Sequence, residues 1–180
     1  MKIKIVRECS DFLRSSEGHP LVKFLATAGP DSRKIKVRKR KAASEFDESF
    51  NKVFINHPDL RQRCIFANGV RGLSSVSENF SAEGNLDAFY IFPVNGFQFI
   101  YSPSVYNSSV QYKETLERFM EVMGCGDAVM AFSEVLKYDY ISAKFAEGLS
   151  LGSEMILYGL PYYYAIRKST INNYSTLFSL

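Results

Sequence analysis

Apolar residues recur with the period of an α-helix in three long stretches of the chain. The stripe over 44–55 is the clearest, because its residues follow the spacing i, i+4, i+7 and i+8 of one helix face (Phe46, Phe50, Val53 and Phe54). Similar stripes predict helices over 110–123 and 127–138, which Gly124-Cys125-Gly126 separates. Shorter helices are expected over 9–16, 19–28 and 142–147. The second of these has Pro20 in its first turn and Gly29-Pro30 after its end.

Strand-like patterns occupy the N-terminus and the middle of the chain. Alternating charged and apolar residues predict a strand over 1–7, and short apolar or aromatic runs predict strands over 64–67, 88–92, 97–101, 155–158 and 162–166. Asn95-Gly96 lies between two aromatic runs and therefore predicts that 88–92 and 97–101 form a hairpin. The polar stretch 68–87 is expected to be a long loop, because it is rich in Gly, Ser and Asn.

Helices and strands follow one another without a regular β-α-β order, which favours an α+β fold with a mixed or antiparallel sheet. A length of 180 residues suits a single domain over 1–180. Within it we expect a helical, basic N-terminal lobe over 1–60, a sheet core over 61–168 and a tail over 169–180. Hydrophobic residues make up 46% of the chain and charged residues 23%, which excludes a disordered or fibrous protein.

Positive charge is concentrated in the first quarter of the chain. Residues 1–41 hold twelve Lys or Arg against four Asp or Glu, a net charge of +8, whereas residues 42–180 have a net charge of −5. Seven of the nine residues over 33–41 are cationic (Arg33, Lys34, Lys36, Arg38, Lys39, Arg40 and Lys41). One interpretation is a solvated edge strand, because Ile35 and Val37 alternate with these cations. The other is a surface that binds nucleic acid or another polyanion, and the two are compatible.

Cysteine and histidine usage points to a reducing compartment without a metal site. Cys9, Cys64 and Cys125 are odd in number and lack CxxC spacing, which argues against a disulfide framework. His19 and His57 are the two histidines, and they are far apart, so we expect no metal cofactor. No apolar run approaches the ~20 residues of a membrane span, and the N-terminus lacks a signal-peptide pattern. We therefore expect a cytoplasmic protein with no membrane partner.

Common catalytic motifs are missing from the sequence. It contains no P-loop, no GxGxxG fingerprint after a strand and no GxSxG elbow. Cys64 and His57 could form a catalytic pair, but no recognisable motif joins them. Glycosidase-type carboxylates cannot be selected among nineteen acidic residues by sequence.

Three short stretches, in their order along the chain, resemble a known family. The first is Val-Arg-Gly-Leu at 70–73, just beyond the strand at 64–67. The second, 99–110, is a strand that ends in a serine-rich turn before a helix. The third, 149–166, is a loop that leads into Glu154 and two strands. This order resembles the Arg–Ser–Glu class of the ADP-ribosyltransferase superfamily, including its phage-encoded and DNA-modifying branches.

The resemblance implies an NAD-dependent mono-ADP-ribosyltransferase, a phage protein that modifies nucleic acid or a host protein in the host cytoplasm. Glu154 would bind the ribose 2′-hydroxyl and stabilise the oxocarbenium-like charge that forms when nicotinamide leaves. Arg71 would anchor NAD through its planar fork of donors. Ser102 or Ser104 would orient the glutamate or the ribose. Three tyrosines are candidates for stacking on the nicotinamide ring: Tyr101, Tyr106 and Tyr112.

Two positions depart from the pattern of that family. Its arginine-modifying members carry a second glutamate two residues before the catalytic one, and this chain has Gly152 there. This favours nucleic acid or another side chain as the target. The usual Ser-Thr-Ser is replaced by Ser102-Pro103-Ser104. This change leaves open that the chain is a degenerate member of the family without catalytic activity.

Two functions without catalysis are also compatible with the sequence. A nucleic-acid-binding or host-interaction protein could use the basic residues at 33–41. A virion structural or assembly accessory protein would agree with the 14% aromatic content and the lack of strong catalytic motifs. The sequence does not predict the oligomeric state.

Overall fold

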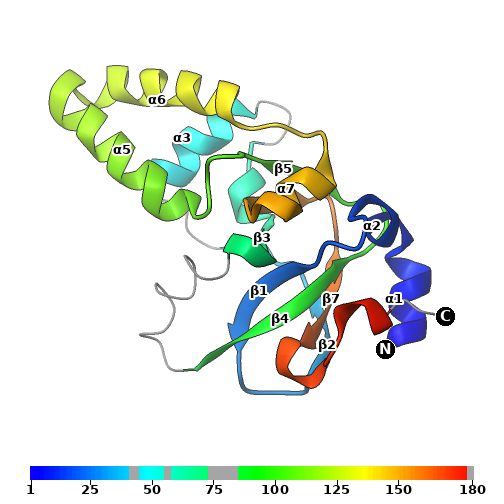
Figure 1. Ribbon diagram of the computed structural model, residues 1–180. Coiled ribbons are helices and arrows are strands. Elements are labelled where there is room, and N and C mark those ends of the chain that lie inside the picture. Colours follow the sequence, from blue (N-terminus) through cyan, green and yellow to red (C-terminus); the bar gives the residue numbers. More distant parts are fainter. Residues whose placement is uncertain (41–44, 55–57, 73–84, 178–180) are drawn as a thin grey trace.

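A seven-stranded antiparallel sheet forms the centre of the protein, in a computed structural model that describes residues 1–40, 45–54, 58–72 and 85–177 (Figure 1). The order across the sheet is β2-β7-β4-β1-β3-β6-β5, and each pairing between neighbours is antiparallel. The strands are β1 (Leu21–Ala26), β2 (Ser32–Lys36), β3 (Ile65–Gly69), β4 (Leu86–Pro93), β5 (Gln98–Tyr101), β6 (Glu154–Tyr158) and β7 (Tyr162–Arg167). Together with the helices, this sheet confirms the predicted α+β class.

Helices lie on both sides of the sheet. Those of the described residues are α1 (Lys2–Glu8), α2 (Ser10–Ser15), α3 (Glu45–Val53), α5 (Ser108–Met123), α6 (Cys125–Asp139) and α7 (Phe145–Leu151). Single 3-10 turns follow the same order: η1 (Leu60–Gln62), η2 (Val70–Gly72), η4 (Lys168–Thr170) and η5 (Tyr174–Leu177). Figure 1 shows α3, α5 and α6 gathered at one end of the molecule, whereas α1 and α2 lie at the other.

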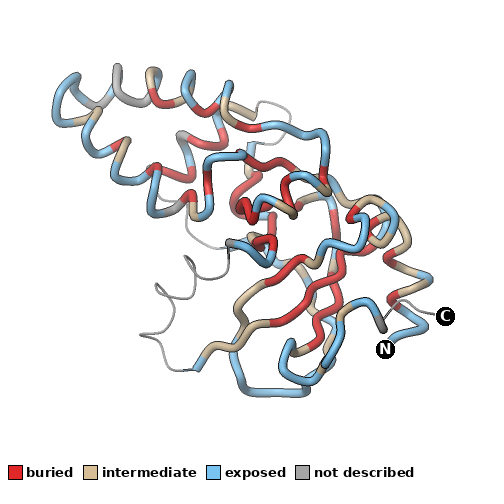
Figure 2. The backbone as a smooth tube through the Cα atoms, in the orientation of Figure 1, coloured by how far each residue is buried: buried red, intermediate tan, exposed pale blue. Residues whose placement is uncertain are grey.

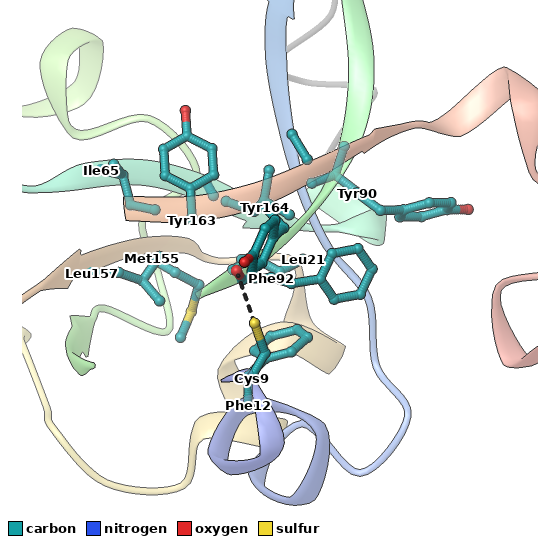
Figure 3. Packing of buried hydrophobic residues seen from close by; sticks show 14 of the residues in the cluster. Cys9, Phe12, Leu21, Ile65, Tyr90, Phe92, Met155, Leu157, Tyr163 and Tyr164 are labelled. Atoms are coloured by element: carbon teal, nitrogen blue, oxygen red, sulfur yellow. Dashed lines mark hydrogen bonds between the residues drawn. The ribbon is translucent and has the colours of Figure 1, made fainter. Parts of the chain in front are cut away.

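One hydrophobic core lies between the sheet and helices α2 and α7 (Figure 3). The Phe12 ring of α2 meets the rings of Phe92 and Phe145 edge to face, each at a centroid distance of 5.9 Å. The Cys9 thiol, fully buried, donates a weak hydrogen bond to the Phe92 carbonyl at 3.5 Å. These contacts hold the N-terminal helices against the sheet, because they bury aromatic surface that water would otherwise cover.

A second core lies on the opposite face of β3, β6 and β5, beneath α3, α5 and α6. Ile156 belongs to this core, whereas its neighbours Met155 and Leu157 belong to the first. Strand β6 is therefore buried on both faces, since successive side chains of a strand point to opposite sides. Phe132 of α6 is fully buried here, while the outer faces of α5 and α6 are exposed (Figure 2).

Most of the longer predicted elements are present. The expected helices at 9–16, 44–55, 110–123 and 127–138 correspond to α2, α3, α5 and α6, and α7 begins within the stretch 142–147. The predicted strands from 64 onward correspond to β3, β4, β5, β6 and β7. Strand β2 stands at the edge of the sheet, as the alternating basic stretch predicts. Within the expected loop at 68–87, residues 73–84 lie outside the described part of the chain.

Two predictions for the N-terminal segment are wrong. Residues 1–7 form helix α1 instead of a strand, and Ile3 is 82% exposed whereas Ile5 is buried. The stretch 19–28 is strand β1, which lies between β4 and β3. Pairing with distant strands decides its conformation, because the local pattern of a short apolar run fits helix and strand equally. Residues 1–60 thus supply two strands to the sheet as well as helices.

The predicted hairpin between 88–92 and 97–101 is also wrong. Strands β4 and β5 are not neighbours, since β7 and β1 flank β4 and β5 pairs with β6. The Asn-Gly turn instead contacts the start of α2. The Asn95 Oδ1 atom accepts a hydrogen bond from the Asp11 amide at 3.0 Å, and the Gly96 amide donates to Asp11 Oδ2 at 3.0 Å. The turn changes the direction of the chain without closing a two-strand ladder.

Candidate functional site

Three predicted site residues come from the same end of three neighbouring strands. Glu154 is the first residue of β6, and Asn68 of β3 lies opposite to it. On the other side of β6, Tyr101 of β5 pairs with Met155, so Ser102 follows directly at the level of Glu154. The Glu154 amide donates to the Val105 carbonyl at 2.8 Å, which holds the serine-rich turn against this end of the sheet. Arg71 lies in η2, just beyond the end of β3.

The Glu154 side chain is nevertheless enclosed, with only 6% of the residue exposed. Its Oε1 atom accepts a hydrogen bond from the backbone amide of Ser108 at 3.3 Å. Burial raises the pKa of this carboxyl, because a charged group loses its hydration inside the protein. The hydrogen bond from Ser108 and the positive charge of Arg61 act in the opposite direction. Glu154 therefore belongs to a buried polar cluster beneath the helices.

Arg61 is the centre of that cluster and was not predicted from the sequence. The residue is 1% exposed, and its Nε atom lies 2.6 Å from Asp47 Oδ1. Its Nη1 atom donates to Ser108 Oγ at 2.8 Å, so Ser108 contacts both Arg61 and Glu154. The guanidinium also lies against three phenyl rings at 4.4–4.9 Å from their centroids: Phe46, Phe50 and Phe66. A buried arginine needs this number of partners, because it stays charged at any ordinary pH.

Two further polar side chains lie in this region. Lys23 of β1, a half-buried residue, donates from Nζ to the Phe66 carbonyl at 2.8 Å, and burial of the ammonium lowers its pKa. The Arg61 amide donates to Asn51 Oδ1 at 3.0 Å. A sequence signal for part of this cluster existed. On α3, Asp47 and Asn51 are spaced i, i+4 directly beside the apolar stripe, where polar side chains face the interior.

The two predicted serines contact each other instead of Glu154. The Oγ atoms of Ser102 and Ser104 lie 3.0 Å apart, and Ser104 Oγ donates to Asp139 Oδ1 at 3.2 Å. Ser102 is fully buried and Ser104 is exposed. Arg71 is exposed as well. The three strand ends are therefore brought together, but each of these side chains has a different environment.

The three predicted tyrosines also have separate environments. Tyr101 is fully buried, and its hydroxyl donates to the Lys144 carbonyl at 3.3 Å. Tyr112 packs in the second core, with its ring 5.6 Å from that of Phe132. Tyr106 is 39% exposed, so among the three it has the ring that a ligand could reach most easily.

The basic stretch lies along the edge of the sheet and continues past it. Strand β2 pairs with β7, and the Val37 amide donates to the Pro161 carbonyl beyond the strand. Lys34, Lys36 and Arg38 are exposed, while the residues between them are half-buried. The Lys34 ammonium lies 3.4 Å from the centroid of the Tyr162 ring, a cation–π contact.

The other cations of the stretch make contacts within the protein. Arg33 donates to the carbonyls of Ala26 and Ala28 and stacks on the Phe89 ring at 4.3 Å. Lys39 pairs with Asp59 at 3.0 Å. Arg40 donates to the Arg61 carbonyl. Lys41 lies outside the described residues. Lys39 and Arg40 are exposed although they make these contacts, whereas Arg33 is half-buried and holds the neighbouring turn.

Comparisons with known proteins found no match: no protein-family model, no curated protein and no solved structure is similar to this chain. Within the described residues, no three His, Cys, Asp or Glu side chains are grouped so that they could hold a metal ion. In the same part of the chain, no helix combines the length and hydrophobicity needed to cross a bilayer.

Proposed function

We propose that the protein binds a polyanion, with nucleic acid as the first candidate, through the exposed edge of β2. The observation that carries this proposal is the alternation of exposed cations at Lys34, Lys36 and Arg38. Side chains at i, i+2 and i+4 of an extended segment project to the same side, about 7 Å apart. Each strand of a nucleic acid carries one negative charge per phosphate at regular intervals. A row of evenly spaced cations therefore suits such a backbone.

Two features of the sheet support this interface. Strand β2 stands at the end of the strand order, so its outer side is open to a partner within the described part of the chain. The ring of Tyr162 lies beneath the Lys34 ammonium and limits its motion. An ordered cation loses less side-chain entropy when a phosphate binds than a free lysine does.

The test measures binding of fluorescent single- and double-stranded oligonucleotides to the full chain at several salt concentrations. The Lys36→Gln/Arg38→Gln variant is expected to lower the slope of log K against log salt by about 2, since each phosphate contact contributes about 0.9. A matched control, Lys113→Gln/Arg118→Gln, removes the same charge from exposed positions on α5. Affinity that does not change with salt, or an equal loss in both variants, would contradict the proposal.

A second candidate function is NAD-dependent mono-ADP-ribosyl transfer, which one specific observation favours. Arg71, Ser102 and Glu154 come from the same end of the adjacent strands β3, β5 and β6. A carboxylate there could stabilise the positive charge that develops on the ribose. Glu154 is enclosed, so the residues that cover it, Ser108 at the start of α5 among them, must move before a ribose can contact it.

This second candidate is tested by release of nicotinamide from NAD in the presence of nucleic acid or cell lysate. Glu154→Gln is expected to abolish release, because the neutral amide cannot stabilise the cationic transition state. Glu147→Gln, which changes an exposed glutamate on α7, is the control and should keep the activity. No release by the unchanged protein, or unchanged release by Glu154→Gln, would exclude this assignment.

A further inference from the structure

A polar pocket lies between α3 and the end of the basic stretch, apart from the exposed face of β2. Its volume is about 450 Å³, within the range of about 300–1,000 Å³ that is typical of small-molecule sites. Residues from three segments line it: Lys39, Arg40, Glu48, Asn51, Lys52, Pro58, Asp59 and Gln62. It is large enough for an organic molecule and larger than a bare anion requires.

Two buried amides form a fixed part of the pocket wall. Asn51 and Gln62 are 5% and 7% exposed, and Asn51 Nδ2 donates to Gln62 Oε1 at 2.8 Å. The Arg61 amide donates to Asn51 Oδ1, and the Arg40 amide donates to the Gln62 carbonyl at 3.0 Å. These contacts hold both side chains in place before a ligand arrives. Asn51 uses both of its polar atoms in these contacts, whereas Gln62 Nε2 takes part in none of them. The Gln62 amide is therefore the group of this wall that can pair with the hydrogen-bonding edge of a nucleobase.

The charged side chains that line the pocket have a net charge of +1. Three are cations, Lys39, Arg40 and Lys52, and two are carboxylates, Glu48 and Asp59. One of these, Asp59, already accepts hydrogen bonds from Lys39 at 3.0 Å and from Arg63 at 2.6 Å. Both contacts lower the pKa of Asp59, so its charge is present and is compensated within the protein.

Lys52 is the cation of this pocket that is most available to a ligand. Its side chain is exposed on α3, and no carboxylate of a described residue lies within the 4.0 Å ion-pair distance of its ammonium. Arg40, by contrast, already donates to the Arg61 carbonyl. An anion in the pocket would therefore gain its strongest new contact from Lys52.

We propose that this pocket binds a mononucleotide, with the phosphate at Lys52 and the base against Gln62. This proposal goes beyond polyanion binding by β2, since it uses different side chains. Either site can be lost while the other remains.

The experiment is calorimetric titration of the full chain with adenosine 5′-monophosphate, adenosine and inorganic phosphate. The monophosphate is expected to bind at least about tenfold more tightly than either part alone, because the two halves of the pocket each contribute. Equal affinity for adenosine and its monophosphate, equal affinity for inorganic phosphate, or no binding up to about 10 mM would each overturn the proposal.

A substitution then tests whether the ligand binds in this pocket. Lys52→Ala is expected to weaken monophosphate binding about tenfold, and Lys113→Ala on α5 should leave it unchanged. Both positions are exposed on helices, and alanine suits a helix, so both variants should fold; thermal melting verifies this. Unchanged affinity in Lys52→Ala would overturn the assignment. Oligonucleotide binding should survive Lys52→Ala, and monophosphate binding should survive Lys36→Gln/Arg38→Gln, which separates the two sites.

Discussion

At the scale of single residues, the least expected feature is the buried charge of Arg61. Its guanidinium binds Asp47 and Ser108 beneath α3 and α5 and is almost completely removed from water. The ion pair with Asp47 joins η1 to α3, the helix that precedes it, and the hydrogen bond to Ser108 joins η1 to α5, which is distant in sequence. The contribution of Arg61 to the stability of the fold depends on every one of its partners being present, because an unpaired charge in the interior is very unfavourable.

We therefore predict that Arg61→Leu lowers the free energy of unfolding by about 3–5 kcal/mol, since it leaves Asp47 buried without its cation. Urea denaturation measures the change. The control is Arg63→Leu, whose surface pair with Asp59 is expected to contribute about 1 kcal/mol or less. Adding Asp47→Leu to the first variant should recover part of the loss. Similar stabilities for Arg61→Leu and Arg63→Leu would contradict the assigned role of Arg61.

Glu8 gives a prediction about pH at the same scale. The hydroxyls of Tyr164 and Tyr162 donate to its Oε2 atom at 2.6 and 3.0 Å, and together they lower the pKa of this carboxyl from 4.5 to about 2. The folded protein thus favours the ionised form. The contribution of the Glu8 carboxylate to the stability of the fold is complete above pH 4.5 and is lost as the pH falls toward 2.

Glu8→Gln should consequently be less stable than the unchanged protein at pH 7, and the difference should shrink between pH 4.5 and 2. Thermal melting across this range measures it. Glu17→Gln, which removes a carboxylate from an exposed position in the turn after α2, is the control. A difference in stability that stays constant from pH 7 to pH 2 would show that Glu8 acts through packing instead of charge.

At the scale of elements, the contact between β3 and α7 is unusually close. A methyl group added to Gly69 would lie 1.9 Å from the Leu149 carbonyl oxygen, which is backbone and cannot turn aside. Helix α7 can approach the end of β3 only because this residue lacks a side chain. The same contact holds η2, and with it Arg71, near the end of the sheet.

We predict that Gly69→Ala destabilises the protein by about 1–3 kcal/mol or more, as overpacking in a well-filled interior does. Gly126→Ala is the matched control, since nothing lies within 4 Å of its added methyl group and it is in helix α6. That substitution should stabilise slightly, by about 0.5–1 kcal/mol, because alanine has the higher helix propensity. Equal effects of both changes would contradict the close approach.

The long helices are predicted correctly, whereas the two segments whose conformation is predicted wrongly are short. Helices α3, α5 and α6 carry apolar stripes over two or more turns, so one face is defined by local spacing alone. Strand β1 and helix α1 are short, and their patterns suit either conformation. Contacts with distant segments decide both, such as the pairing of Val22 with Tyr90 on one side and with Asn68 on the other.

At the scale of the whole molecule, every strand pairing joins segments that are distant in sequence. Even β5 and β6, which are consecutive strands, are separated by the three helices α5, α6 and α7. No hairpin is present among the strands of the described residues. The chain must close long loops before any ladder of strands forms. The conformational entropy of these loops is lost before the contacts between the strands can compensate for it.

This topology predicts slow folding, in milliseconds to seconds, which is typical of sheets with non-local contacts. Stopped-flow refolding from urea measures the rate. A Lys36→Gln/Arg38→Gln variant should refold at nearly the unchanged rate, because those side chains are exposed and make few native contacts. Complete refolding within microseconds would contradict the strand order.

The sequence by itself determined the α+β class, the three long amphipathic helices and the cluster of cations at 33–41. Each of these depends on composition or on local periodicity. Only the tertiary structure decided which strands are neighbours, and therefore that Arg61, Ser108 and Glu154 share one buried cluster. Their contact depends on the pairing of β3 with β6 and on the helices that cover both strands. Local spacing carries no information about such distant pairings, because burial and hydrogen bonding across the sheet select them.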